Sequence, residues 1–507
     1  MALIPDQISY QWPHSGIFRV DYIWAIMNAD NQFDELFARL ETVAVRLRDS
    51  GVKAALLDAP SSRPLETTND IDLVVSSIKE AIRAFSDFGF FIQLRPQKKK
   101  SLESLPLPHF RACYGIGGKV LTVDLVQVKD EPRSPWAGLY STIEKHPLIG
   151  FPVGCLSVRV AWKTYRYFAV GKVVYAKQLS RLQDQWLRLC ESDTRAAIEL
   201  VRSFPEGSNA LILRERLIRS QNHEALAELL EEAKNTNGYR TKEQNRLVLG
   251  GSLLVGRITA ALQVSRAFFY RFVLRYPISA FPVIAFVGND GGGKSSTITG
   301  LASDRLVKLD PLVLSLKRKD SFLRLFRPMR RWLSNITAQN DRKTISWALV
   351  FPARWLLEAM DFVDRLLRFW LSLLWARSGL GPVFMDRYVT DRLRGEYARD
   401  KFQLYPLEQF FPMPDAFTFF DVPAEISMER KPEDNHNLTV LREKRSNYLK
   451  LMNEINRVHR VDGTSTPSNV SQSTSAFILS VCHEIAKSQR GGSARKWGRA
   501  TWRPGSE

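Results

Sequence analysis

The sequence has few cysteines, a shortage of acidic residues relative to basic ones, and no leader-like start. Its four cysteines in 507 residues show no Cys-x-x-Cys spacing, which argues against a disulfide framework and against a cysteine zinc site. Residues 1–16 lack the basic and then apolar pattern of a secretory signal peptide. We therefore expect a cytoplasmic protein with reduced thiols.

Long uncharged apolar runs are also missing. The stretch 347–375 is apolar enough to suggest a membrane span, but six charged residues interrupt it: Arg354, Glu358, Asp361, Asp364, Arg365 and Arg368. A membrane-spanning helix needs about 20 mostly uncharged residues, so this pattern predicts an amphipathic helix or helix pair, broken near Pro352. Segment 253–276 mixes arginines with apolar residues, which is typical of an interdomain connector or of a helix lying on a membrane surface. We favour the connector and leave peripheral membrane contact open.

Basic residues outnumber acidic ones by 72 to 53, which gives a formal net charge of +19. This charge favours anionic partners such as nucleotides, nucleic acid or an acidic membrane face, without choosing among them. Nucleic acid is not favoured, because Lys98, Lys99 and Lys100 are more typical of a solvated loop.

The length exceeds what one hydrophobic core supports, so we expect two or three domains. Alternating strand and helix signals flank a mostly helical middle, which predicts an α/β fold class. We expect a first α/β domain, a helical middle with connector, a second α/β domain with a mostly parallel sheet, and a basic disordered tail, over residues 1–157, 158–276, 277–488 and 489–507 respectively.

The strongest functional signal is a glycine-rich turn between an apolar strand and the start of a helix, within residues 283–297. It fits G-x-x-x-x-G-K-[ST] at every fixed position. Glycines let the backbone wrap around a phosphate, and the helix adds its positive N-terminal end, whereas a turn without function is the alternative. Lys294 would reach the β/γ-phosphates of ATP and Ser295 would ligate Mg²⁺. The predicted nucleotide-binding residues are Gly288, Asp290, Gly291, Gly292, Gly293, Lys294, Ser295 and Ser296.

Two later strands carry residues that narrow the chemistry. The strand 383–386 ends in Asp386 and is followed by Arg387, an acid placed for a second Mg²⁺ contact and a base placed to meet a phosphate. The strand 416–421 leads into a basic segment, where Arg430 and Arg442 are candidates to neutralise the transferring group. The alternatives are a surface ion pair and a solvated, charge-rich helix.

With these motifs in order, residues 281–487 resemble the thymidylate kinase family of nucleoside monophosphate kinases. The matching segments are the G-x-D-G-x-G-K-[ST] loop, Asp386-Arg387-Tyr388, Asp421-Val422-Pro423 and Val461-Asp462-Gly463. The resemblance implies a P-loop NTPase fold and ATP-dependent phosphotransfer, with Ser295 and Asp386 as metal-holding residues. The catalytic residues that it implies are Lys294, Asp386, Arg387, Arg430 and Arg442.

The acceptor side departs from that family. Members carry Arg-Glu-Pro-Gly after the second strand, whereas residues 314–320 here read Leu-Ser-Leu-Lys-Arg-Lys-Asp. Lys317 or Arg318 would then hold an acceptor phosphate. The insertion 324–375 resembles divergent thymidylate-kinase-like proteins associated with bacterial surface polysaccharide production, so the expected acceptor is a phosphate-bearing compound or a sugar.

The N-terminal region carries three acids in strand patterns. Asp70 and Asp72 lie two residues apart on an apolar strand, so both carboxylates project from one face, and Asp124 lies in a later strand. Three carboxylates on adjacent strands would hold a pair of Mg²⁺ ions. This region resembles the nucleotidyltransferase fold, although the glycine turn of that fold is missing near Ser61 and Ser62. An active transferase, a degenerate binding module and a strand with capping aspartates all stay open.

The sequence thus predicts an ATP- and Mg²⁺-dependent kinase resembling thymidylate kinase. The alternatives are a nucleotidyltransferase that acts through the N-terminal aspartates and an ATP-gated protein that binds a polyanion. The expected partners are a nucleotide and a phosphate-bearing or sugar acceptor, and a homodimer stays open.

Overall fold

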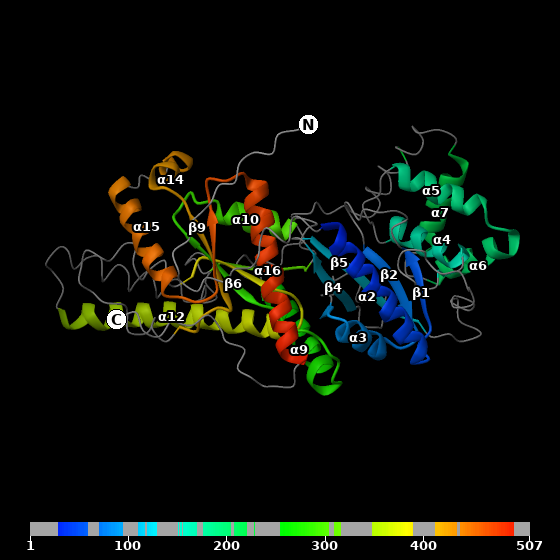
Figure 1. Ribbon diagram of the computed structural model, residues 1–507, viewed down its shortest axis with the longest axis horizontal. Coiled ribbons are helices and arrows are strands. Elements are labelled where there is room, and N and C mark those ends of the chain that lie inside the picture. Colours follow the sequence, from blue (N-terminus) through cyan, green and yellow to red (C-terminus); the bar gives the residue numbers. More distant parts are fainter. Residues whose placement is uncertain are drawn as a thin grey trace.

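The protein contains two five-stranded sheets with helices around them, a mixed α/β fold that confirms the predicted class (Figure 1). The computed structural model describes residues 29–58, 70–94, 110–116, 119–128, 151, 153–154, 156–169, 176–203, 207–220, 228, 254–303, 309–315, 347–388, 411–432 and 437–490. The predictions for Ser61, Ser62, Lys98–Lys100, Lys317, Arg318 and the tail beyond residue 490 lie outside these residues.

The first sheet has the order β1-β2-β5-β4-β3. Its strands are β1 (Ala54–Asp58), β2 (Asp70–Val75), β3 (Phe91–Leu94), β4 (Phe110–Ile116) and β5 (Lys119–Gln127), and only β2 and β5 run parallel. Helices α2 (Ala29–Asp49) and α3 (Ile78–Asp87) cover one face. Ile71, Leu73 and Val75 point into the core beneath these helices.

The helical middle covers the opposite face of the first sheet. It consists of α4 (Leu156–Thr164), the π-helical turn η2 (Tyr165–Ala169), α5 (Ala176–Leu187), α6 (Glu191–Arg202) and α7 (Gly207–Arg219). These helices share a second core with Ala55, Leu57 and Val74, whose side chains alternate with those of the first core. This part is therefore a cover for β1 and β2 and contributes to the surroundings of the N-terminal acids.

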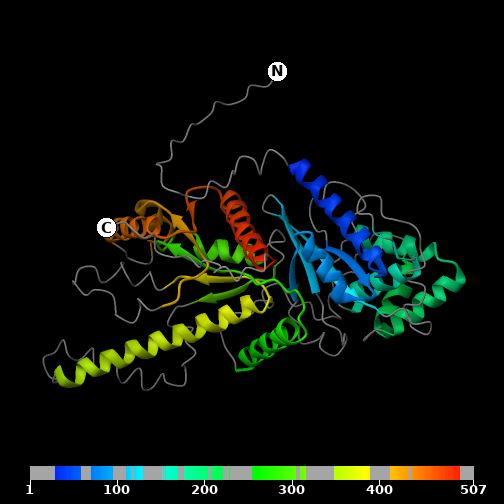
Figure 2. The same ribbon diagram turned by 60° about the horizontal axis from the view of Figure 1, so that its bottom comes forward.

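The second sheet is entirely parallel, with the order β10-β9-β6-β8-β7. Its strands are β6 (Val283–Gly288), β7 (Leu312–Ser315), β8 (Val383–Asp386), β9 (Ala416–Asp421) and β10 (Val458–Asp462). Every residue of β6, β8 and β9 is buried, because helices cover both faces of a parallel sheet. Figures 1 and 2 show α12 (Trp347–Arg377) on one side and α10 (Lys294–Ser303) and α16 (Pro467–Arg490) on the other.

The predicted break near Pro352 is wrong, because α12 is one continuous helix over 347–377. A proline removes one main-chain hydrogen bond, and Pro352 lies only five residues after the start of the helix, where the loss disturbs least of its length. Segment 253–276 forms α9 (Leu254–Phe268) and the π-helical turn η4 (Phe269–Val273), which ends before Pro277. In the described part of the chain, no helix is both long and apolar enough to cross a membrane.

One continuous hydrophobic core joins the two sheets. Helix α16 contacts β3 and β4 as well as its own sheet, and the ring of Phe91 meets that of Phe281 edge-on at 5.9 Å. The amide of Ile92 donates to the Ser279 hydroxyl, and the Ser279 amide donates back to the Ile92 carbonyl. Edge strand β3 is therefore held against the start of the parallel-sheet unit.

Candidate functional site

The glycine-rich loop follows β6, the central strand of the parallel sheet, and leads into α10 at Lys294. Strands β8 and β9 lie on either side of β6 and end at the same edge of the sheet. The carboxyl edge of such a sheet is where α/β proteins bind ligands, and the N–H groups that open a helix attract anions. The loop therefore lies at the position where proteins of this architecture can bind an anion.

Two glycines of the loop serve different purposes. Gly291 and Gly293 have φ angles of +81° and +85°, which residues other than glycine rarely adopt. A Cβ atom at Gly291 would lie 2.5 Å from the Ser427 carbonyl oxygen, whereas one at Gly293 would meet nothing within 4 Å. Gly291 thus allows close packing against the chain at Ser427, and Gly293 borders open space that a phosphate could fill.

Lys294 is buried at the loop, and its ammonium group donates to the carbonyl oxygens of Gly288 and Asn289, each at 2.7 Å. These bonds fold the side chain back over its own loop. The Lys294 ammonium group therefore lies at the same loop as the open space beside Gly293. Two residues further along α10, the side chain of Ser296 is exposed.

The hydroxyl of Ser295 lies 3.2 Å from an Asp386 carboxylate oxygen, although the two residues are 91 positions apart. Parallel strands bring their carboxyl ends together, so the end of β8 meets the first turn of α10. Hydroxyl and carboxylate oxygens are the ligands that Mg²⁺ prefers. This pair, beside the open space at Gly293, fits a Mg²⁺ ion that accompanies bound phosphates.

Asp290 forms an ion pair with Arg387, and its other oxygen lies 3.7 Å from the Lys444 ammonium group. Arg387 has a φ of +75°, a strained conformation for a residue with a side chain. The structure thus places the predicted acid and the predicted arginine against each other. Lys444 belongs to α15 (Leu438–Asn453), so this acid also ties the loop to that helix.

The two arginines predicted to close over a phosphate lie in different settings. Arg430, the last residue of α14 (Ala424–Arg430), donates to the Gly463 carbonyl at 2.8 Å, and a Cβ at Gly463 would lie 3.4 Å from the Gly292 carbonyl oxygen. Arg430 is therefore anchored beside the loop. Arg442 is exposed and pairs with Glu425 at 2.6 Å, which joins α15 to α14.

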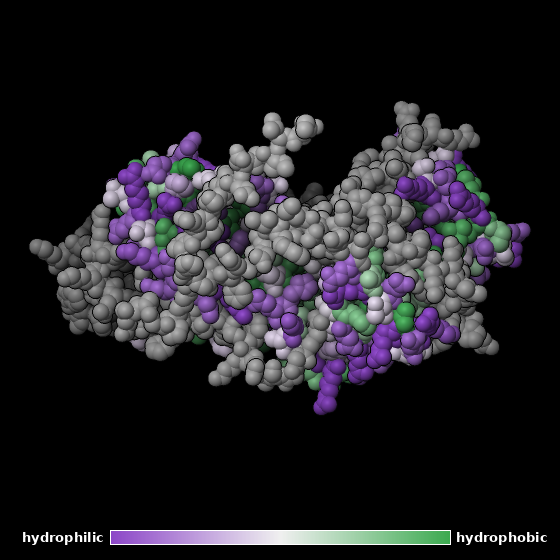
Figure 3. Space-filling model, in the orientation of Figure 1, coloured by the Kyte–Doolittle hydropathy of each residue, from purple (hydrophilic) through white to green (hydrophobic). Residues whose placement is uncertain are grey.

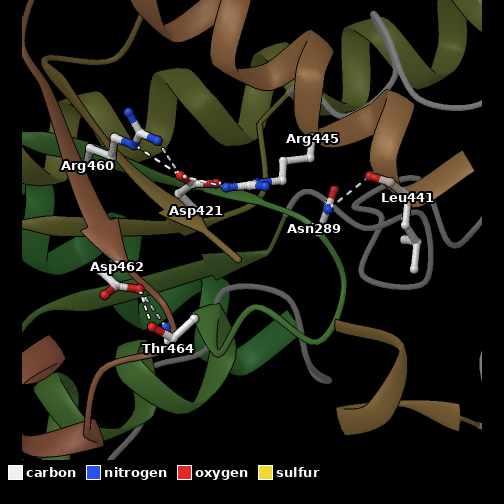
Figure 4. Close-up of polar contacts among 7 residues, drawn as sticks. All are labelled: Asn289, Asp421, Leu441, Arg445, Arg460, Asp462 and Thr464. Carbon is white, nitrogen blue, oxygen red and sulfur yellow. Dashed lines mark hydrogen bonds and ion pairs between the residues drawn. The ribbon is translucent and has the colours of Figure 1, made fainter. Parts of the chain in front are cut away.

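Two further polar links around the loop were not predicted (Figure 4). The buried side chain of Asn289 donates to the Leu441 carbonyl at 3.2 Å, and Asp421 at the end of β9 accepts from both Arg445 and Arg460. Burial alone would raise the pKa of Asp421, but the hydrogen bonds and charges of the two arginines outweigh it and lower that pKa. The sequence signals for Asp421 were its position at the end of a strand and its place in the Asp421-Val422-Pro423 segment, and neither signal predicted its two arginine partners.

Four charged residues of α12 point inward. Asp361, Asp364, Arg365 and Arg368 are all buried. Arg368 donates to the Ser315 carbonyl at 2.7 Å, at the carboxyl end of β7, and forms an ion pair with Asp364. The sequence singled these residues out only as interruptions of an apolar run, whereas the structure puts them at the edge of the sheet that carries the loop.

The N-terminal acids lie on neighbouring strands, as predicted. Asp72 and Asp124 are register partners on β2 and β5, and both are buried. The Arg111 guanidinium donates to Asp124 at 2.9 Å, and the Trp162 indole donates to Asp72 at 3.5 Å. The side chain of Asp70 lies outside the described part of the structure. Asp124 is thus paired with a buried cation, and within the residues that can be placed no group of three or more His, Cys, Asp or Glu is arranged to hold a metal ion.

Neither protein-family models nor curated proteins match this chain. The functional assignment therefore depends on the geometry of the loop and its neighbours. That geometry combines a buried lysine, a hydroxyl–carboxylate pair and open space beside a positively charged helix end. Groups of this kind are chemically suited to hold a polyphosphate and a metal ion.

Proposed function

We propose that this protein is an ATP- and Mg²⁺-dependent phosphotransferase with a P-loop NTPase fold, similar to nucleoside monophosphate kinases. The observation that carries the proposal is the 3.2 Å approach of Ser295 to Asp386 beside a loop whose Gly293 borders open space. A glycine turn without function would not require a carboxylate from a distant strand at this point. The all-parallel sheet and the central position of β6 also support it.

In this mechanism the loop amides and the start of α10 bind the β- and γ-phosphates of ATP. Ser295 and Asp386 would hold Mg²⁺, which supplies positive charge to the phosphates when bound. Lys294 moves from its bonds with the loop carbonyls to the phosphate oxygens. The bond from the γ-phosphorus to the β-phosphate oxygen breaks, a bond to the acceptor oxygen forms, and ADP leaves. Where the acceptor is a hydroxyl group, its proton passes to water.

Arg387 and Arg430 act on the charge of the transferring group. Arg387 is held at the loop by Asp290, and Arg430 by the Gly463 carbonyl. Cations that are fixed before the reaction stabilise developing charge without reorganisation. The inward Arg368 lies on the acceptor side, at the end of β7.

The test is transfer from γ-labelled ATP to a panel of monophosphates and sugars by the full chain. We expect acceptor-dependent ADP formation and a loss of about 100-fold or more in Lys294→Ala. Lys450→Ala, on the exposed surface of α15, is the matched control and should behave as wild type. Transfer by Lys294→Ala at the wild-type rate would refute the assignment.

A nucleotidyltransferase activity is the second candidate, favoured by the adjacent buried acids Asp72 and Asp124. Such an enzyme releases pyrophosphate, whereas a kinase releases ADP. Pyrophosphate release that Asp72→Asn abolishes and Lys294→Ala leaves intact would support it. Polyanion binding that weakens steeply with salt, without any transfer, would instead indicate an ATP-gated binding protein.

A further inference from the structure

Helix α12 exposes a row of large apolar side chains, although Phe369, Leu373 and Trp375 of the same helix are buried. Its exposed large apolar side chains are 43% to 59% accessible and belong to Trp355, Leu356, Val363, Leu367, Trp370 and Leu374. At 100° per residue, the last five fall within an arc of about 60°, opposite the buried Asp361, Asp364, Arg365 and Arg368. The stripe from Leu356 to Leu374 is about 27 Å long. Soluble proteins usually bury apolar residues, and a contiguous exposed apolar stripe is typical of a surface that binds a membrane or another protein.

A second exposed apolar region lies directly beside the end of α12. Leu262, Phe268, Phe269, Phe272, Val273 and Leu274 of α9 and its continuation are 37% to 65% accessible. Arg271 donates to the Arg377 carbonyl at the end of α12, and Figures 1 and 2 both show α9 next to that end. Twelve of the sixteen exposed large apolar side chains in the described residues belong to these two regions.

Elsewhere in the described residues, the large apolar side chains that are exposed are Val45, Leu187, Ile212 and Met428. On the face shown in Figure 3, the coloured residues are mainly hydrophilic and the apolar ones lie in small separate patches. The concentration of apolar side chains along α12 and α9–η4 is therefore a local property.

The sequence segments that contain α9–η4 and that precede α12 are basic. Residues 244–289 contain five arginines and no acidic residue, and residues 316–346, which lead into α12, contain nine basic and two acidic ones. Arg275 is exposed, and Arg266 lies 5.5 Å over the ring of Tyr270. Burial and the neighbouring Arg377 lower the pKa of Arg271 to about 10, so it is still cationic at neutral pH.

We propose that α12 and α9–η4 together form a peripheral membrane-binding face that docks on a bilayer containing anionic lipids. Aromatic and aliphatic side chains beside arginines are the composition of helices that lie at the headgroup boundary, where aromatic rings settle and arginines meet lipid phosphates. A second copy of this chain is a poorer occupant, because a two-fold contact would bring together the arginines of α9–η4, a segment that contains no acidic residue. The proposal does not depend on the phosphotransferase assignment.

The test is sedimentation of the full-length protein with vesicles of phosphatidylcholine alone or mixed equally with phosphatidylglycerol. We expect binding to the mixed vesicles that falls as salt is added, and much weaker binding to phosphatidylcholine. Val363→Ser/Leu367→Ser and Phe268→Ser/Phe272→Ser should each weaken binding at least about tenfold. Ile212→Ser, a 60% exposed apolar residue on α7, is the matched control and should bind as wild type.

Three results would overturn the proposal. The first is absence of wild-type binding to the mixed vesicles, and the second is equal binding by the double variants. The third is a wild-type dimer, detected by light scattering, that is lost in the double variants while no protein binds vesicles. That result would assign the face to a second copy of the chain. Melting curves of the variants confirm that these exposed substitutions leave the fold intact.

Discussion

Replacing Gly291 with alanine should destabilise the protein more than the same replacement at Gly293. The two glycines have nearly equal φ angles, +81° and +85°, so the conformational cost of a side chain is similar, about 1–2 kcal/mol at each. Their surroundings differ, because a Cβ at Gly291 would lie 2.5 Å from the Ser427 carbonyl oxygen and one at Gly293 would touch nothing within 4 Å. The pair therefore separates backbone strain from collision.

The collision at Gly291 has to be relieved by moving main chain, since the obstacle is a carbonyl of α14 and not the end of a flexible side chain. Overpacking of this kind costs about 1–3 kcal/mol. Added to the backbone strain, this gives about 2–5 kcal/mol for Gly291→Ala, against about 1–2 kcal/mol for Gly293→Ala.

The assay is urea denaturation of the full-length variants, followed by fluorescence and by circular dichroism so that separate unfolding steps are recognised. ATP binding is measured in parallel. Gly293→Ala places a methyl group in the space proposed for phosphate, so it should lose ATP affinity while it keeps most of its stability. Equal destabilisation by both variants would refute the packing argument, and unchanged ATP affinity in Gly293→Ala would refute phosphate binding at that point.

Three other predictions concern polar groups. Asp386→Asn should keep the fold and raise the Mg²⁺ concentration needed for transfer, measured by titrating Mg²⁺; an unchanged titration would contradict its metal role. Arg111→Met removes the buried cation that pairs with Asp124 and should cost about 3–5 kcal/mol, whereas Asp310→Asn, at the half-exposed end of the same network, should change stability by at most about 1 kcal/mol in urea denaturation. Similar losses in both would contradict this. Burial lowers the pKa of His459 to about 4. As the pH drops, His459 is protonated in the unfolded chain before it is protonated in the folded protein. The free energy of unfolding should therefore fall between about pH 6.5 and pH 4, and His459→Gln should flatten that part of the stability profile.

The loop and its partners show what local sequence predicts well. A glycine-rich turn between a buried strand and a helix is encoded by neighbouring residues, and the meeting of Ser295 with Asp386 follows from the rule that parallel strands end at one edge. The partners of Asn289, Asp421 and Arg442 were not predictable in this way. They depend on how α14, α15 and β10 are oriented, which no residue pattern states.

The continuity of α12 through Pro352 was predicted wrongly for a different reason. Proline weakens a helix locally, but its effect on a whole helix depends on position and on the packing of the remaining turns, and α12 runs on to Arg377. The N-terminal acids were predicted only in part. Asp72 and Asp124 were expected on adjacent strands, and the structure confirms this. The buried Arg111 that pairs with Asp124 comes from β4, whose register with β5 only the sheet reveals.

The sequence by itself determined the local chemistry of this protein: a cationic chain, a glycine-rich loop of the kind that suits phosphate, and an apolar helix interrupted by charges at helical spacing. Helical periodicity says which residues share a face, but it does not say which face turns inward, because that choice depends on what the rest of the chain offers on each side. Only the tertiary structure decided that the charges of α12 turn toward the parallel sheet and its apolar stripe toward the outside. It likewise decided that β3 and α16 join two sheets, far apart in sequence, around one core.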